Sequence, residues 1–366
     1  LLGSDHIDVL ATIYNTGQTY HQCGELDNAM ELYNEFLLIA KKRLGSNHRD
    51  VGTILKCMAQ IYQQRQQFDE SEKLYKEALA IGKVVHGDNH PEVACVLNNL
   101  GNLLYEKGDF DAAIKTYKEG LAVERDVLDK HHNNIVVTMT NIGQIYKIRG
   151  NYKSALLLYN DAANIQRDSL GASHPSVANT LSLIASIHYR MKKYRKALDI
   201  QQEVLRIRRD AYGDNHLNVA TTLNSIGLIL YKLELHSYAL QAFQQCLGIR
   251  RKLMGDYHKD VAVVLYNIGT CYFETGSDDE AISYYKETLH VETEALGLDH
   301  DDTLLTIHRL GDIHQQRGEL DEALKYFNRI VNARKSSSET DYNKISNALI
   351  DIGNVYLRRA QTEEMM

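Results

Sequence analysis

The stretch GDNHPEVACVLNNLG, residues 87–101, decides the fold because its outline returns along the whole chain. GSDHIDVLATIYNTG at residues 3–17, GDNHLNVATTLNSIG at 213–227 and GDYHKDVAVVLYNIG at 255–269 keep its first glycine, its histidine and its last glycine. The starting glycines recur at steps of 42 residues, or of 84 where Asp129 and His132 stand in for the glycine–histidine pair: Gly3, Gly45, Gly87, Gly171, Gly213, Gly255 and Gly297. A fixed period of this length indicates a repeat architecture in which each copy is one supersecondary unit.

Two ladders of residues keep the same step without any insertion. One carries a small residue in every copy: Gly17, Ala59, Gly101, Gly143, Ala185, Gly227, Gly269, Gly311 and Gly353. The other carries alanine or serine, followed four residues later by an aromatic ring in most copies, as at Ala113 and Tyr117. We expect the small residues of the first ladder to let neighbouring helices approach closely, while the rings fill the space beyond.

Each copy is predicted to hold two amphipathic helices. Leu97, Leu100 and Leu104 fall at helical spacing, and so do Ala113 and Tyr117. The turn between the two helices is expected at residues 108–109, a second turn at 87–89 separates one copy from the next, and prolines 91 and 175 occupy the first helical position.

A single helix pair cannot cover its own apolar face, so the copies are expected to stack around one continuous core. The predicted fold is an all-α, right-handed superhelical solenoid of stacked antiparallel helix pairs. We expect a single repeat domain over residues 1–366, with eight complete copies at 3–338 and the first helix of a truncated ninth copy at 339–366. The first helix of every copy would line a concave surface.

Composition excludes several classes of function. Lysine and arginine number 41 against 48 acidic residues, a net charge of −7 that argues against nucleic-acid binding. No apolar run approaches the roughly 18–20 residues that span a bilayer, so no membrane association is expected. The five cysteines are scattered and never form a CxxC pair, which favours a reducing, cytoplasmic location.

The pattern Leu97, Leu100, Gly101, Leu104, Ala113 and Tyr117 resembles the tetratricopeptide repeat. The added segment HPEVACVLNNLG at residues 90–101 makes it similar to the 42-residue variety of kinesin light chains. That resemblance implies a non-catalytic scaffold that binds short, acidic peptide segments in its concave groove, as a cargo adaptor does. It also implies attachment to a kinesin heavy chain through an upstream heptad segment, which this sequence lacks. The alternative is a sensor or assembly arm of a larger signalling ATPase, which an upstream nucleotide-binding motif would favour.

In this family, the side chains three and six residues before each small-ladder residue face the groove, and so do those one and four residues after it. The side chain two residues before the small-ladder residue often faces the groove as well. The amides at or beside these positions are Asn15, Asn98, Asn99, Asn102, Asn141, Asn224 and Asn267. Because an amide both donates and accepts, such a row is suited to the backbone of an extended peptide. The alternative is that these amides tie adjacent helices together.

Cationic and aromatic side chains supply the remaining candidates. A basic stripe complementary to acidic ligands is predicted from Lys56, Lys147, Arg190 and Lys232. Anchors for an apolar side chain are predicted at Tyr105, Tyr189, Tyr231 and Phe273. Ordinary solvated charges and packing between copies are the respective alternatives. The carboxylate clamp of chaperone-tail binders is disfavoured, because only Lys56 and Asn99 match it.

Nothing in the sequence indicates catalysis, and we expect neither a cofactor nor a metal. The repeat-start histidines are too far apart in a stack to share one ion, so we expect each to close the inter-repeat turn and cap a helix end. The phosphate-binding, zinc-protease and nucleophile-elbow motifs do not occur.

Overall fold

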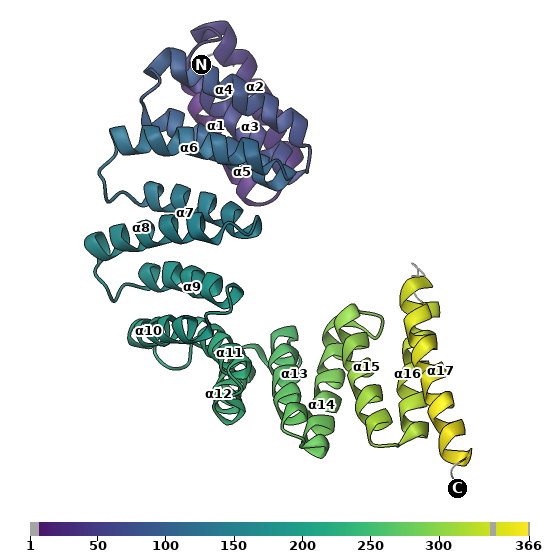
Figure 1. The fold of residues 1–366 in the computed structure, drawn as a ribbon. Helices are drawn as coiled ribbons and strands as arrows, with labels where there is room; N and C mark the ends of the chain where they lie inside the picture. Colours follow the sequence, from purple (N-terminus) through teal and green to yellow (C-terminus); the bar gives the residue numbers. More distant parts are fainter. Residues whose placement is uncertain (1–6, 337–341, 365–366) are drawn as a thin grey trace. The chain divides into compact units, whose positions relative to one another are not determined.

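The protein is described by a computed structural model that covers residues 7–336 and 342–364 (Figure 1). Seventeen α-helices and no strands occur in these residues. The chain divides into two compact units, residues 1–187 and 188–366, with the boundary inside α9 (Pro175–Arg190). The predicted boundary between the eighth and ninth copies, near residue 338, lies outside the described residues, and the single-domain organisation stays a prediction.

The first unit holds four helix pairs and most of α9. Its helices are α1 (Ile7–Gln22), α2 (Leu26–Leu44), α3 (Arg49–Gln64), α4 (Phe68–His86), α5 (Pro91–Lys107), α6 (Phe110–Val127), α7 (Asn133–Ile148) and α8 (Tyr152–Leu170). Each even-numbered helix packs against the helix before it and, from α2 to α6, against the helix after it. The odd-numbered helices are thus the first helices of the predicted copies and the even-numbered helices the longer second ones.

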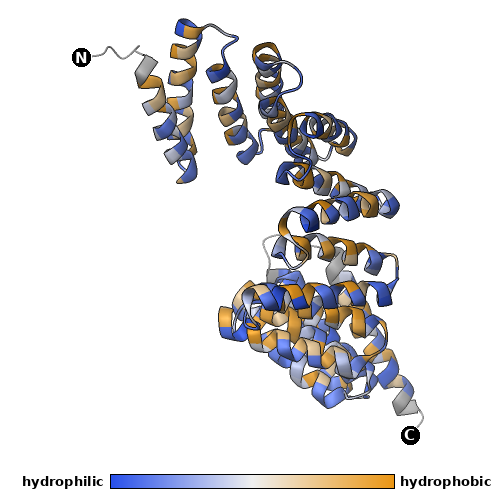
Figure 2. Ribbon diagram, turned by 90° about the vertical axis from the view of Figure 1, so that its left-hand side faces the viewer, coloured by the Kyte–Doolittle hydropathy of each residue, from blue (hydrophilic) through white to orange (hydrophobic). Residues whose placement is uncertain are grey.

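The second unit continues the same alternation. Its helices are α10 (Tyr194–Tyr212), α11 (Leu217–Lys232), α12 (His236–Met254), α13 (Lys259–Glu274), α14 (Asp278–Leu296), α15 (Asp301–Gln316), α16 (Leu320–Ser336) and α17 (Tyr342–Glu364). The helices carry hydrophobic and hydrophilic residues side by side (Figure 2), as stacked amphipathic pairs require. None of the described helices is both long and apolar enough to cross a membrane.

The turns follow the predicted chemistry. Gly108 ends α5 in the left-handed region, with φ of 85°, and the Asp109 carboxylate accepts a hydrogen bond from the Ala112 backbone at the start of α6. Helices α5 and α9 begin at Pro91 and Pro175. The two prolines therefore stand at the first helical position, as predicted.

The repeat-start histidines cap the first helices. The Nδ1 atom of His90 accepts a hydrogen bond from the Glu92 backbone N–H at 3.1 Å. The same bond is made at 3.1–3.2 Å by His48, His132, His174, His216, His258 and His300. The predicted capping role is thus confirmed for these seven histidines, while His6 lies outside the described residues.

The small ladder packs directly on the aromatic one. An added Cβ at Gly101 would lie 2.6 Å from the Tyr117 ring, and one at Gly227 would lie 2.5 Å from the Phe243 ring. Non-bonded carbon atoms do not approach this closely, so each glycine is required by the ring that lies against it. The predicted close approach of the helices is confirmed at the glycines of the ladder from Gly17 to Gly311, whereas Gly353 in α17 is exposed and has no ring against it.

Candidate functional site

An amide-lined hollow of about 610 Å³ opens between the first helices of the first unit. We call it the amide hollow, and its walls come from α1, α3, α4 and α5 with one turn residue. It is lined by His21, Gln60, Gln63, Gln64, Gln66, Tyr75, Asn99, Asn102 and Glu106. Asn102 and Gln63 stand one and four residues after the small ladder, where the repeat pattern directs side chains toward the groove.

Several polar groups of the amide hollow form few or no hydrogen bonds within the described part of the chain. The Asn99 amide contacts only the Cys95 Sγ atom, at 3.9 Å, and Gln60 makes no side-chain hydrogen bond in the described part of the chain. The Nε2 atom of His21 is buried and has no hydrogen-bond partner there. Unpaired buried polar atoms cost free energy, so this hollow favours a polar occupant.

Two tyrosine hydroxyls hold other amides in place. The Tyr75 hydroxyl donates to Gln63 Oε1 at 3.3 Å, and the Tyr117 hydroxyl donates to Asn102 Oδ1 at 2.5 Å. Burial raises the pKa of both phenols, so each stays protonated and remains a donor near neutral pH. The amides of Gln63 and Asn102 are therefore oriented before any ligand arrives.

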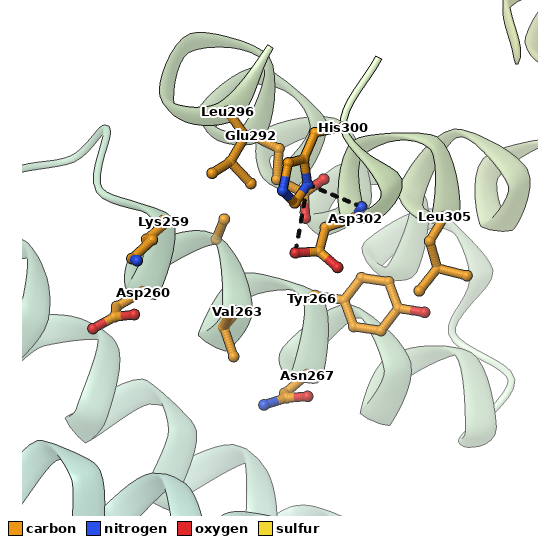
Figure 3. Close-up of a pocket in the computed structure, with 11 residues that line it drawn as sticks. Lys259, Asp260, Val263, Tyr266, Asn267, Glu292, Leu296, His300, Asp302 and Leu305 are labelled. Atoms are coloured by element: carbon orange, nitrogen blue, oxygen red, sulfur yellow. Dashed lines mark hydrogen bonds and ion pairs between the residues drawn. The ribbon is translucent and has the colours of Figure 1, made fainter. Parts of the chain in front are cut away.

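A second hollow, of about 340 Å³, lies in the second unit between α13, the end of α14 and the start of α15 (Figure 3). We call it the acidic hollow. It is lined by Lys259, Asp260, Ala262, Val263, Tyr266, Asn267, Glu292, Leu296, His300, Asp302 and Leu305. The candidate Asn267 lies in its wall, and the buried Glu292 carboxylate is its most unusual group.

Comparison with known families agrees with the 42-residue pattern. One sequence model described as tetratricopeptide repeat matches residues 50–126, 92–168, 176–252, 236–291, 260–336 and 302–364, and a second model of the same description matches 9–50. The chain belongs to the tetratricopeptide repeat family. Repeats of this family generally form non-catalytic scaffolds for protein–protein interaction.

Solved tetratricopeptide-like structures share the fold. BtubC (BKLC) from P. vanneervenii has a TM-score of 0.55 and 19% identity, covering 63% of this chain and 91% of that one. The C-terminal part of a TPR repeat-containing protein from Cytophaga hutchinsonii has a TM-score of 0.55 and 15% identity, with 80% and 98% covered. A putative kinesin light chain from Podosopora anserina has a TM-score of 0.51 and 18% identity, with 57% and 98% covered. Comparison with curated proteins gave no match.

Within this tetratricopeptide repeat chain, most of the predicted amides link helices. Asn141 on α7 donates to Asn102 on α5 at 3.3 Å, and Asn267 on α13 donates to Asn224 on α11 at 3.2 Å. Asn98 donates to the Glu124 carboxylate of its own repeat at 2.7 Å. The linking role is therefore present for these five amides, and their contact with a peptide stays a prediction. Asn15 is exposed on α1.

The predicted cationic residues lie in different settings. The ammonium group of Lys56 is 2.6 Å from Glu92 Oε1 and the side chain is only 17% exposed, so the chain itself neutralises this charge. Lys147 belongs to the first unit, whereas the exposed Arg190 and Lys232 belong to the second. Their alignment into one stripe stays a prediction.

The predicted aromatic anchors are half-buried, and three of them pack against a ring of their own repeat. The rings of Tyr105 and Phe110 are 5.7 Å apart, and those of Tyr189 and Tyr194 are 5.4 Å apart. Tyr231 lies against His236 and its hydroxyl donates to Glu274 at 3.3 Å. Phe273 is also half-buried. Each ring retains some exposed surface, so it can pack within the chain and contact a ligand at the same time. Their role as ligand anchors stays a prediction.

Sequence reasoning missed a buried polar ladder near the end of the second helices in this tetratricopeptide chain. Its members are Glu124, Gln166, Arg208, Arg250, Glu292 and Arg334, all less than a tenth exposed. Thr180 donates to Gln166 at 2.7 Å, and Arg208 donates to Thr222 at 2.8 Å, in each case 14 residues along the chain. A polar residue recurring every 42 positions, followed 14 residues later by a threonine in four of the six copies, is the signal that could have identified these links between repeats.

Proposed function

We propose that this chain is a non-catalytic scaffold that holds short, extended peptide segments of partner proteins, with the amide hollow as a contact for the peptide backbone. The observation that carries the proposal is the amide hollow itself. Its carboxamides lie on neighbouring first helices, some are oriented by buried tyrosines, and others have donors and acceptors without internal partners. An extended backbone presents the complementary N–H and C=O groups at every residue.

We propose further that acidic side chains of the bound segment approach Lys147, Arg190 and Lys232, in the manner of a cargo adaptor. The 42-residue repeat, shared with kinesin light chains, supports this assignment, and so does the exposure of Arg190 and Lys232. Attachment to a kinesin heavy chain would require a segment outside this sequence.

The test is peptide selection against the full chain, followed by affinity measurement with the selected peptide. The double variant Gln60→Ala/Asn99→Ala removes two amides of the hollow without removing a strong internal bond. We expect it to weaken binding by roughly five- to 150-fold, because each of the two lost hydrogen bonds to a desolvated backbone is worth about 0.5–1.5 kcal/mol.

The matched control is Asn34→Ala, which removes an exposed amide from the second helix α2. It should bind the peptide like the unmodified chain. Equal affinities for the double variant and the control would contradict the assignment of the amide hollow.

A further inference from the structure

The acidic hollow contains a buried carboxylate, one oxygen of which has no hydrogen-bond partner in the described residues. Glu292 is 5% exposed, and its Oε2 atom is buried with no hydrogen-bond partner among the described residues. Burial raises the pKa of Glu292 to about 7, and the Asp302 carboxylate adds to the rise, whereas the Thr306 hydroxyl opposes it. A buried, unpaired carboxylate is costly, and a cation placed beside it would remove that cost.

The remaining wall of the acidic hollow suits an aliphatic stem. Val263 on α13 and Leu305 on α15 are 48% and 49% exposed, and the Tyr266 ring lies between the same two helices (Figure 3). The apolar rim and the carboxylates of the acidic hollow are together complementary to lysine and arginine. The methylene stems of these side chains pack on apolar surface while the charged head pairs with an anion.

Neither of the basic side chains in the wall of the acidic hollow, Lys259 and His300, forms an ion pair with Glu292 in the described residues. Lys259 is exposed and forms no ion pair in the described residues, and it points away from Glu292 (Figure 3). The Nδ1 atom of His300 accepts the capping hydrogen bond from the Asp302 backbone. In the preceding repeat the position of Glu292 is occupied by Arg250, which donates to the Asp260 carbonyl at 2.6 Å.

At the same place five repeats earlier, the chain pairs the corresponding carboxylate with a cation of its own. There a hollow of about 230 Å³ is lined by Gly82, His90 and Glu92, which correspond by position to Glu292, His300 and Asp302. Lys56 stands where Tyr266 stands in the later repeat, and its ammonium group pairs with Glu92 at 2.6 Å. The acidic hollow thus carries Glu292 where the earlier repeat has a glycine, and Tyr266 where the earlier repeat has the lysine that neutralises its carboxylate.

We propose that the acidic hollow binds a lysine or arginine side chain of a partner peptide, with Glu292 and Asp302 as its counter-charges. The proposal rests on peptide binding as the general function and adds a basic anchor residue to the bound segment. It requires a positively charged residue in the part of the peptide that contacts the second unit. This requirement is additional to the acidic side chains proposed to approach Lys147, Arg190 and Lys232.

The experiment titrates the full chain with three small probes and follows the methyl NMR signals of Val263 and Leu305. N-acetyl-arginine amide and N-acetyl-lysine amide carry the charge, and N-acetyl-citrulline amide has the shape of arginine without it. We expect one or both charged probes to shift the two methyl signals and citrulline to leave them in place. Glu292→Gln should weaken the charged probe about tenfold or more, because a charge-assisted bond is lost.

Glu124→Gln is the matched control, since Glu124 occupies the same ladder position but accepts a hydrogen bond from Asn98 and does not line the acidic hollow. It should leave probe binding unchanged. Glu292→Gln removes a buried charge and keeps the side-chain shape, so it should fold, which circular dichroism checks. Equal shifts with citrulline, unchanged affinity in Glu292→Gln, or no shift with either charged probe would overturn the proposal. The Gln60→Ala/Asn99→Ala variant separates the two hypotheses, because loss of the amide hollow should leave these methyl shifts intact.

Discussion

At the scale of single residues, the chain contains two kinds of glycine, which differ in whether there is room for an added Cβ atom. Gly227 is buried in α11, and an added Cβ would lie 2.5 Å from the Phe243 ring. Gly248 is exposed in α12, and an added Cβ there would meet nothing within 4 Å. The first glycine is required by packing, whereas the second only lowers helix stability.

Gly227→Ala should therefore destabilise the protein by about 1–3 kcal/mol through overpacking, even though alanine is the better helix former. Gly248→Ala should stabilise it by about 0.5–1 kcal/mol. Urea denaturation of both variants checks this pair of expectations. A stabilised Gly227→Ala variant would mean that the ring moves aside and that the ladder does not fix the distance between helices.

The sequence allowed the glycine ladder to be predicted but not the environment of Glu292. A small residue recurs opposite a ring in most copies, so periodicity alone indicates contact. The position of Glu292 carries alanine, glycine, glutamate, glutamine or arginine in different copies. Whether each is satisfied depends on a partner from the next repeat, and periodicity does not reveal which partner is missing.

At the scale of helices, the ends could be predicted more fully than the contacts between first helices. Pro91, Gly108 and the histidine caps follow local backbone chemistry, which the sequence displays directly. The hydrogen bonds that join neighbouring first helices, such as Asn267 to Asn224, depend on side-chain pairs 39 or 43 residues apart. This is why the amides could be named from the sequence while their internal bonds could not.

Helix α17 is joined to α15 through a histidine held between two carboxylates. His308 Nδ1 lies 3.0 Å from Asp312 on its own helix, and Nε2 lies 2.9 Å from Asp351 on α17, while the Phe327 ring of α16 packs against the imidazole. Asp312 and Asp351 raise the pKa of His308 despite its partial burial. The link is strongest when the imidazole is charged.

Because the folded-state pKa of His308 is raised, its contribution to stability is fully present below about pH 6.5 and is lost as the pH rises through the raised value. We expect protection factors of α17 amides, corrected for intrinsic exchange, to fall as the pH rises above about 6.5. The side chain is 37% exposed and therefore screened by solvent, so the effect should not exceed about 1 kcal/mol.

His308→Gln should abolish this pH dependence of α17. His290→Gln is the control, because His290 is exposed and forms no ion pair in the described residues. A pH dependence that survives in His308→Gln would assign it to a different group.

At the scale of the whole molecule, function depends on departures from a uniform repeat. The repeat itself produces stacked helix pairs in both units, and any tetratricopeptide chain of this period would share them. The ligand preference comes from positions where one copy differs from the next, such as lysine or tyrosine three residues before the small ladder. A net charge of −7 also means that an acidic ligand is repelled overall and must be attracted locally.

Reversing the three cationic candidates tests that local attraction. The triple variant Lys147→Glu/Arg190→Glu/Lys232→Glu should weaken a labelled peptide that alternates glutamate with small residues, and binding to the unmodified chain should weaken as salt rises. The control triple Lys115→Glu/Lys153→Glu/Arg195→Glu changes exposed cations on second helices and shifts the net charge equally. If both triple variants lose the same affinity, the effect is global repulsion, and the three first-helix cations form no binding stripe. If only the first loses affinity, the charge acts at the proposed positions, because overall repulsion is matched in the two proteins.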